Sequence, residues 1–363
     1  MITFADKLAR IPHYEAGATS VEAAGREGTA EVAQLASNES PYAPVAEVIE
    51  AVREAAAGVN RYPDPGARAL KRALAARYDL DPGRIAVGNG SCEILLAAAE
   101  ALLEPGDDVV YAWPSFSMYP HLAATTGAEA TTVSLARGDV HDLEGIRLAI
   151  GDRTRLALVC NPNNPTGTHV PSEEVAGFLE KVPPRVLVVL DEAYVEFQVV
   201  EDPDATLQLL ERFPNLVLLR TFSKVYGLAG LRVGYALGSE EFRRAVDQVR
   251  QPFAVNHLAQ AAATEALRHQ DDVARRVERN AIERLWVADE LEGIGLPAVE
   301  SQANFCWIDL GDREEPAVVQ GLASRGVAVR AGAGLGAPGH IRVSYGTRHD
   351  NQRFVSALAE TIG

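Results

Sequence analysis

The sequence predicts an α/β protein with a large, mostly parallel seven-stranded sheet and a smaller α/β domain. Two observations lead to this prediction. Between residues 85 and 238, seven short apolar runs rich in Val, Leu and Ile alternate with amphipathic stretches. Such runs are typical of parallel strands that helices cover on both faces. After residue 257, helical and strand-like stretches alternate again, which indicates the second domain.

The elements of the large sheet follow in chain order. An irregular opening ends in LASNESPYAP, and a helical pattern follows in VAEVIEAVREAAAG. The seven expected strands are RIAVG, DDVVYA, EATTVSL, RLALVC, RVLVVLD, LVLLRTF and LRVGYAL. The helices expected between them are CEILLAAAEALL, DLEGIRLAIG, PSEEVAGFLEKV and ATLQLLERF, which show apolar residues at helical spacing.

The smaller domain is expected from the C-terminal elements. Long helical patterns occupy about 257–293, and they precede the strand FCWIDL, the helix-plus-strand unit VVQGLASRGVAVRAG, the strand HIRVSYG and a last helix from about residue 350. We therefore expect an N-terminal arm over 1–45 that helps to complete the small domain. The large domain would span 46–265 and the small C-terminal domain 266–363.

Charge and composition exclude several classes of function. The 363 residues are 47% hydrophobic and 23% charged, as in ordinary globular proteins, and carry a formal net charge of −16. This charge argues against general nucleic-acid binding, which needs a basic face. An anionic ligand would have to be held by a local group of arginines.

Cysteines, histidines and apolar runs indicate a cytoplasmic protein without a bound metal. The three cysteines form no CxxC pair, and the eight histidines show no metal-ligand spacing. The opening MITFADKLARIPHYEAG lacks the apolar core of a signal peptide, and no apolar run approaches the length of a membrane span.

Polar clusters follow several strands, at the edge where open α/β sheets bind ligands. After RIAVG come Gly90, Ser91 and Cys92, which open a helix and could present backbone N–H groups to an anion. After RLALVC comes NPNNPTG, whose two prolines would fix a loop that presents Asn164. Taken alone, either piece is also explained by an ordinary turn.

Two further strands end in ionisable residues. RVLVVL is followed by Asp191, with Tyr194 close behind, and a buried carboxylate needs a cation or hydrogen-bond donors. An N-cap is the alternative for Asp191, but no clear helical pattern follows it. LVLLRTF is followed by Ser223 and Lys224, and Arg232 lies eight residues beyond the lysine.

Together these groups suit a ligand with a phosphate, a ring nitrogen, a ring oxygen and an aldehyde. Ser223, Arg232 and the helix start at Gly90 suit the phosphate. Asp191 would keep a pyridine nitrogen protonated, and Asn164 and Tyr194 would donate to a phenolic oxygen. Lys224 would form a Schiff base with the aldehyde. Phe116, in the loop WPSFSMY, could stack on the ring.

These motifs also carry a resemblance that runs nearly end to end. The chain resembles the aspartate-aminotransferase superfamily of pyridoxal-phosphate enzymes, fold type I, and within it the histidinol-phosphate aminotransferases. The matching stretches are ASNESPYAP, RYPDP, VGNGS, WPSFSMY, NPNNPTG, DEAY, TFSKVYGLAGLRVGY, RQPF, ANF, VAVR and IRVSYGTR. NPNNPTG, DEAY and the lysine motif are specific for the cofactor class and less specific for the substrate.

The resemblance implies a role for each matching residue. Pyridoxal 5'-phosphate would be held by Gly90, Ser91, Cys92, Phe116, Asn164, Asp191, Tyr194, Ser223, Lys224, Arg232 and Tyr62. Lys224, Asp191 and Tyr194 would be catalytic, and Lys224 would be the base. Tyr62 resembles a tyrosine that reaches the phosphate from the other subunit of a homodimer. Asn38, Arg330 and Arg342 resemble the groups that bind the substrate.

The implied reaction transfers an amino group between a small-molecule donor and a 2-oxo acid by ping-pong kinetics. Histidinol phosphate with 2-oxoglutarate, as in histidine biosynthesis, is the leading pair. An aromatic-amino-acid aminotransferase is a close alternative, and a fold-type I decarboxylase of a phosphorylated amino acid is a third. A cofactor-sensing regulator would need a DNA-binding domain, for which the length and charge leave no room. Cys92, Ala254 and His257 depart from the residues common in relatives, and these departures concern the substrate rather than the cofactor.

Overall fold

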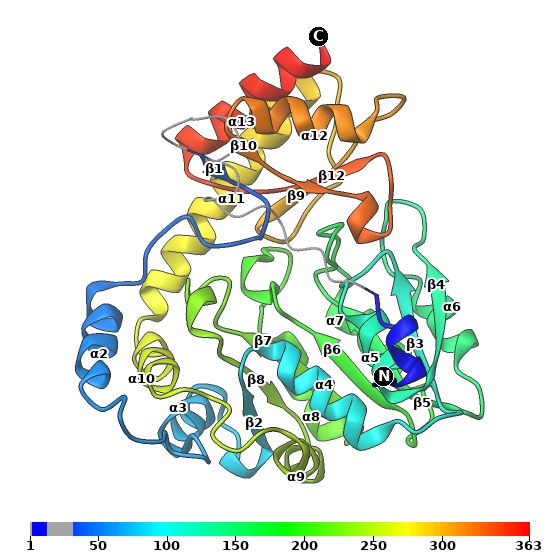
Figure 1. Ribbon diagram of the computed structural model, residues 1–363, viewed down its shortest axis with the longest axis vertical. Coiled ribbons are helices and arrows are strands. Elements are labelled where there is room, and N and C mark those ends of the chain that lie inside the picture. The colour runs from blue at the N-terminus through cyan, green and yellow to red at the C-terminus, as the bar shows by residue number, and fades with distance from the viewer. Residues whose placement is uncertain (1, 13–31) are drawn as a thin grey trace.

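The computed structural model of the protein describes residues 2–12 and 32–363 (Figure 1). Its main sheet has the strand order β2-β8-β7-β6-β5-β3-β4. The strands are β2 (Ile85–Gly88), β3 (Asp108–Trp113), β4 (Glu129–Ser134), β5 (Thr154–Cys160), β6 (Leu187–Asp191), β7 (Leu216–Thr221) and β8 (Gly234–Leu237). Only β8 runs antiparallel to its neighbours, so the predicted seven-stranded, mostly parallel sheet is confirmed.

Helices cover both faces of this sheet. One face packs against α4 (Ser91–Leu102), α5 (Tyr119–Thr126) and α9 (Glu240–Val249). The other face packs against α2 (Ala46–Ala56), α3 (Arg68–Tyr78), α6 (Leu143–Ala149), α7 (Ser172–Leu179), α8 (Leu209–Arg212) and α10 (His257–Ala266). Neighbouring residues of β5 show the alternation, because Leu158 belongs to the first core and Val159 to the second. Burial on both faces explains why the strands are near-continuously apolar.

Three helices of the large unit are missing from the sequence prediction. In α3 only Leu70, Leu74 and Tyr78 are buried, and arginines, a lysine and alanines occupy the positions between them. Helix α5 has eight residues and carries a proline in its first turn, so it resembles a loop in sequence. Helix α9 buries only Phe242 and Val246. These helices are at most 11 residues long and bury only two to four residues each, so each offers few apolar positions from which to predict a helix.

The C-terminal elements form a second sheet with its own core. The antiparallel sheet has the order β11-β12-β9, with β9 (Phe305–Asp309), β11 (Arg330–Ala331) and β12 (His340–Ser344). Helices α11 (Gln270–Gly293), α12 (Glu315–Ser324) and α13 (Arg348–Ile362) pack with it at the top of Figure 1. The long patterns predicted over 257–293 are thus two helices, α10 and α11.

The N-terminal segment lies beside these C-terminal elements. Strand β1 (Ala33–Gln34) pairs in parallel with β10 (Val327–Ala328) (Figure 1). The chain then crosses without regular structure to α2 on the other side of the molecule. The domain boundaries at residues 45 and 265 stay a prediction, and residues 13–31 of the expected arm lie outside the described residues.

In the described ranges, every helix is too short or too polar to cross a lipid bilayer.

The strands that matter for the site end side by side. Cys160 at the end of β5 is in register with Asp191 at the end of β6, and Asp191 is in register with Leu219 of β7. The three carboxyl ends therefore open at one edge of the sheet, where the sequence analysis expects a ligand.

Candidate active site

A cavity of about 360 Å³ opens at this edge, a size within the range of small-molecule sites. Most of the predicted residues line it, namely Ser91, Cys92, Phe116, Asn164, Asp191, Tyr194, Ser223, Lys224 and Arg232. They come from the ends of β5, β6 and β7, from the start of α4 and from the loop after β3. Residues far apart in the chain thus meet around one volume.

Lys224 lies in the loop that follows β7. Its Nζ donates to the carbonyl oxygen of Ser37 at 3.2 Å and lies 5.5 Å from the centre of the Tyr194 ring. Burial, aided by the positive charge of Arg342, lowers the pKa of Lys224 to about 8, and Glu39 opposes this shift. Near neutral pH a fraction of the amine is therefore unprotonated, as a nucleophile or a base requires.

Asp191 ends β6 with only 2% of its surface exposed. Its carboxylate accepts from the Tyr119 hydroxyl at 3.2 Å and from the backbone N–H of Ala193 at 3.3 Å, which are both neutral donors. Burial raises the pKa of Asp191 to about 6. A cationic ring nitrogen placed in the cavity would offset this burial, so the carboxylate fits the predicted pyridinium partner.

An anion cradle lies at the start of α4. Gly90 is the N-cap with φ of 81°, and a Cβ there would overlap the guanidinium of Arg232. The Arg232 Nη1 donates to Ser223 Oγ at 3.4 Å. A Cβ on Gly234 would overlap the backbone at Ser91, so β8 packs directly against the helix start. Backbone N–H groups, a hydroxyl and a guanidinium therefore converge, which suits a phosphate.

A buried hydrogen-bonded chain joins the large sheet to the second sheet. The Tyr194 hydroxyl accepts from Asn38 Nδ2 at 3.0 Å and from Asn164 Nδ2 at 3.4 Å. Asn164 Oδ1 in turn accepts from Arg342 Nη1 at 2.6 Å. Burial raises the pKa of Tyr194 far above its ordinary value, so the phenol stays protonated and can donate to a ligand oxygen.

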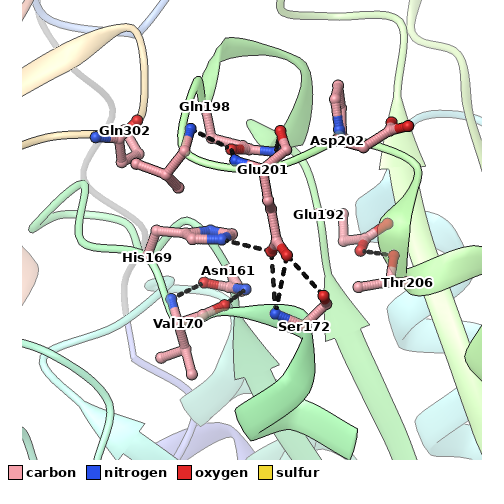
Figure 2. Close-up of polar contacts among 12 residues, drawn as sticks. Asn161, His169, Val170, Ser172, Glu192, Gln198, Glu201, Asp202, Thr206 and Gln302 are labelled. Atoms are coloured by element: carbon pink, nitrogen blue, oxygen red, sulfur yellow. Dashed lines mark hydrogen bonds and ion pairs between the residues drawn. The ribbon is translucent and has the colours of Figure 1, made fainter.

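The loop that carries Asn164 is fixed from its outer side (Figure 2). Asn161 and Val170 close its base with two hydrogen bonds of 2.8 Å. Glu201 accepts from His169 Nε2 at 2.9 Å and from Ser172 Oγ at 2.6 Å, which ties the start of α7 to the loop after Tyr194. Rigid support of this kind keeps a side chain in the geometry that a site needs.

Five predicted residues lie outside the cavity lining, namely Gly90, Asn38 and Arg342, whose contacts are given above, and Tyr62 and Arg330. Tyr62 is 81% exposed and stacks on Phe253 with ring centres 4.5 Å apart, beside His257 in a separate surface groove. Its contact with another subunit stays a prediction. Arg330 is buried on β11, directly opposite Arg342 on β12. Facing residues of antiparallel strands point to the same side of a sheet, so the two guanidiniums share one face.

Phe116 and Cys92 are two further predicted residues that line the cavity. Phe116 lies on the cavity wall with its ring edge-to-face to Tyr119 at 5.7 Å. Cys92 lies in the first turn of α4, and burial raises its pKa, so it is a small neutral group there. The described residues contain no group of three or more His, Cys, Asp or Glu side chains that could hold a metal ion.

Sequence reasoning missed several residues of the site. Ser37 and Glu39 line the cavity on either side of Asn38, and the motif ASNESP was their available signal. Tyr119, the donor to Asp191, closes the motif WPSFSMY. Cys160 is the last residue of β5, where its position at a strand end pointed to the cavity.

The model of the family "Aminotransferase class I and II" matches residues 30–358 of this chain. The chain therefore belongs to the class I and II aminotransferases. The predicted class, a pyridoxal-phosphate-dependent aminotransferase of fold type I, is confirmed.

Individual relatives fall under two names. The aromatic amino acid aminotransferase of Thermobifida fusca is 45% identical over 351 residues, covering 96% of this chain and 94% of that protein. The histidinol-phosphate aminotransferase of Moorella thermoacetica is 42% identical over 336 residues, covering 92% and 86%. A crystal structure of histidinol-phosphate aminotransferase from Sinorhizobium meliloti with pyridoxal-5'-phosphate matches with a TM-score of 0.88 at 30% identity, covering 99% and 97%. The predicted resemblance is confirmed, and the two names leave two substrates to distinguish.

Proposed function

We propose that the protein transfers the amino group between histidinol phosphate and 2-oxoglutarate, as a homodimer in the cytoplasm and as a step of histidine biosynthesis. The observation that carries the choice of substrate is the facing pair of buried arginines, Arg330 and Arg342. Like charges directly opposite each other on neighbouring strands destabilise a sheet. A multiply charged anion between them would offset the repulsion.

The residues around the cavity fit pyridoxal phosphate. Gly90, Ser91, Cys92, Ser223 and Arg232 would hold its phosphate, Asp191 its ring nitrogen, Asn164 and Tyr194 its ring oxygen, and Phe116 one face of its ring. When bound, this cofactor supplies an electron sink for the carbanion that forms at the substrate Cα.

The chain itself supplies the positioned proton carrier. Lys224, with its pKa lowered to about 8, can act as a base near neutral pH and move the Cα proton of the amino donor. Ser37 holds the amine in place through its carbonyl oxygen. Asp191 would keep the cofactor ring nitrogen protonated, because the buried carboxylate gains most from a cationic neighbour.

The substrate side of the cavity favours a polar amino donor. Its phosphate would bind near Arg342 and Arg330, since a phosphate monoester carries nearly two negative charges at neutral pH. Beyond Phe116 and Tyr194, the cavity wall among the described residues has no further aromatic side chain. Glu39 lies on that wall and could accept a hydrogen bond from an imidazole ring, whereas a phenyl ring has nothing to donate.

Amino transfer from an aromatic amino acid is the second candidate. The 45% identity to the Thermobifida fusca aromatic amino acid aminotransferase favours it. Its single carboxylate would need only one of the two arginines, and Arg342 alone could bind it bidentately.

The test is a titration of the purified holoenzyme, followed by the visible absorbance of the bound cofactor. Histidinol phosphate and phenylalanine are added in parallel, and steady-state rates with 2-oxoglutarate are measured for each. We expect the absorbance to change at much lower histidinol phosphate, with a higher kcat/KM. A higher kcat/KM for phenylalanine would overturn the proposal and establish the second candidate.

A further inference from the structure

Arg276 has an unusual set of partners for a helix residue. It lies on α11 and is only 5% exposed. Its Nη1 donates to Ser40 Oγ at 3.0 Å and to the carbonyl of Tyr42 at 3.2 Å, and its Nη2 donates to the carbonyl of Ala43 at 2.6 Å. Asp272, one turn earlier, accepts from its Nε at 2.6 Å. The guanidinium is therefore hydrogen-bonded to the chain between β1 and α2 at three residues.

The segment that Arg276 holds, residues 35–43, carries part of the active site and has no regular secondary structure. The Ser37 carbonyl accepts from Lys224 at 3.2 Å, and Asn38 donates to the Tyr194 hydroxyl at 3.0 Å. The carbonyl of Ala36 accepts from Arg342 at 2.8 Å. Because this segment forms no helix or strand of its own, its conformation depends on contacts with neighbouring parts of the chain, such as these.

The loop after Lys224 packs on the same guanidinium. Gly227 has φ of 70°, and a Cβ there would lie 3.0 Å from Arg276 Nη1 and 3.2 Å from the Tyr42 carbonyl oxygen. The N–H of Gly227 donates to the carbonyl of Lys224 at 3.0 Å. One buried guanidinium therefore touches both segments that approach the Lys224 amine.

We propose that Arg276 is a positioning residue for amino transfer, which sets segment 35–43 against Lys224 and Tyr194 without touching the reacting atoms. At its other end the segment is held by Ser344, whose Oγ accepts from the Asn38 N–H at 2.8 Å, and by Asn304, which donates to the Asn38 carbonyl at 3.1 Å. Loss of Arg276 would free residues 40–43 and shift Ser37 and Asn38. This inference needs only the Lys224 chemistry of the proposed function and not its choice of substrate.

The experiment uses the holoenzyme with Arg276→Lys and Arg276→Met. Lysine keeps the charge but replaces the five-donor fork with a single ammonium. Arg275→Met is the matched control, because Arg275 lies on the same helix with an exposed side chain that pairs with the exposed Asp271 and the partly buried Asp272. Hydrogen exchange of segment 35–43 is measured in the holoenzyme and the apoprotein, together with cofactor affinity, kcat and KM for the better donor.

We expect faster exchange confined to residues 35–43 in both Arg276 variants, with cofactor affinity kept within about threefold. The kcat should fall about tenfold in Arg276→Lys and about 100-fold in Arg276→Met, since displacement of a positioning group by about 1 Å can have effects of that size. Arg275→Met should match the wild type. If Arg276→Met does not fold, Arg276→Lys alone decides.

Two results would overturn the inference. One is unchanged exchange in segment 35–43, which would show that Arg276 does not hold it. The other is faster exchange in segment 35–43 with wild-type kcat, which would show that the Arg276 hydrogen bonds have no catalytic consequence. Wild-type enzyme without any aminotransferase activity would instead refute the proposed function, so the two failures are distinguishable.

Discussion

At the scale of single residues, burial moves the two central ionisable groups in opposite directions. It lowers the pKa of the Lys224 amine to about 8 and raises that of the Asp191 carboxyl to about 6. In both cases the charged form is the one that burial disfavours. The amine is thereby prepared to lose a proton, and the carboxylate to accept a cationic partner.

The shift of Lys224 predicts a pH-dependent stability of the apoprotein. Below pH 8 the folded chain bears the cost of a buried ammonium, and the cost disappears as pH rises from about 8 towards the unfolded value of 10.5. Wild-type apoprotein should therefore gain roughly 1–3 kcal/mol over this range relative to Lys224→Met. Urea unfolding of both proteins at pH 7 and pH 10 measures the difference. An equal difference at both pH values would show that Lys224 is not desolvated.

Replacement of Asp191 tests the ring-nitrogen contact. We expect Asp191→Asn to bind the cofactor more weakly and to lower kcat by roughly 1,000-fold, because a neutral amide cannot keep the ring nitrogen protonated. The folded-state pKa of about 6 lies above the ordinary aspartate value of 3.8, so the ionised carboxylate destabilises the apoprotein at pH 7. The variant apoprotein should thus be at least as stable as wild type, which separates lost activity from unfolding. Near-normal turnover would refute the role of Asp191.

At the scale of elements, the ends of the strands were predictable and the segments beside them were not. Parallel strands bring their carboxyl ends to one edge, so Asn164, Asp191 and Lys224 could be placed together from sequence alone. The contribution of segment 35–43 is largely made by backbone carbonyls, such as that of Ser37. Any residue type carries a carbonyl, so the identity of Ser37 does not reveal this contact, although the motif ASNESP marked the segment.

The prediction of helices from the sequence was limited in a similar way. The apolar helix α4 was predicted because five of its residues are buried, namely Ile94, Leu95, Ala97, Ala98 and Ala99. Helix α3 was missed because its buried face is a single narrow stripe. The contacts of Arg276 could likewise not be predicted, since an arginine on a charged helix looks like a surface residue in the sequence, whereas the fold buries it.

The junction of α4 with the loop after β7 predicts a steric effect at Gly90. Gly90→Ala would place a methyl group against Arg232 at a φ of 81°. We expect cofactor affinity to fall about 10- to 100-fold, or about 1.4–2.8 kcal/mol, as measured by equilibrium titration. Gly138→Ala is the control, because its φ of 83° is equally strained while its surroundings are open. Equal losses of cofactor affinity in both variants would contradict the cradle.

At the scale of the whole molecule, the protein carries a net charge of −16, although its candidate site is suited to an anion. The guanidinium of Arg232 lines the cavity, and Arg330 and Arg342 are proposed to add positive charge on the substrate side. Tyr62 is 81% exposed, and in the proposed homodimer its side chain would reach the phosphate site of the second chain.

A subunit-mixing experiment tests this dimer. Lys224→Met and Tyr62→Ala should each be nearly inactive alone. Equal mixing after subunit exchange should restore about one quarter of wild-type activity, because half of all dimers are then heterodimers and each heterodimer has one intact site of two. Sedimentation checks that both variants are dimers. Dimers that exchange subunits without any recovery would show that Tyr62 acts within its own chain.

The central claim is that Lys224 is the amine that condenses with pyridoxal phosphate. The most direct measurement is borohydride reduction of the holoenzyme, proteolysis and mass spectrometry of every lysine-containing peptide. The account predicts that the reduced cofactor is attached to Lys224 and to no other lysine. Attachment at another lysine, or quantitative recovery of unmodified Lys224 from active enzyme, would contradict it.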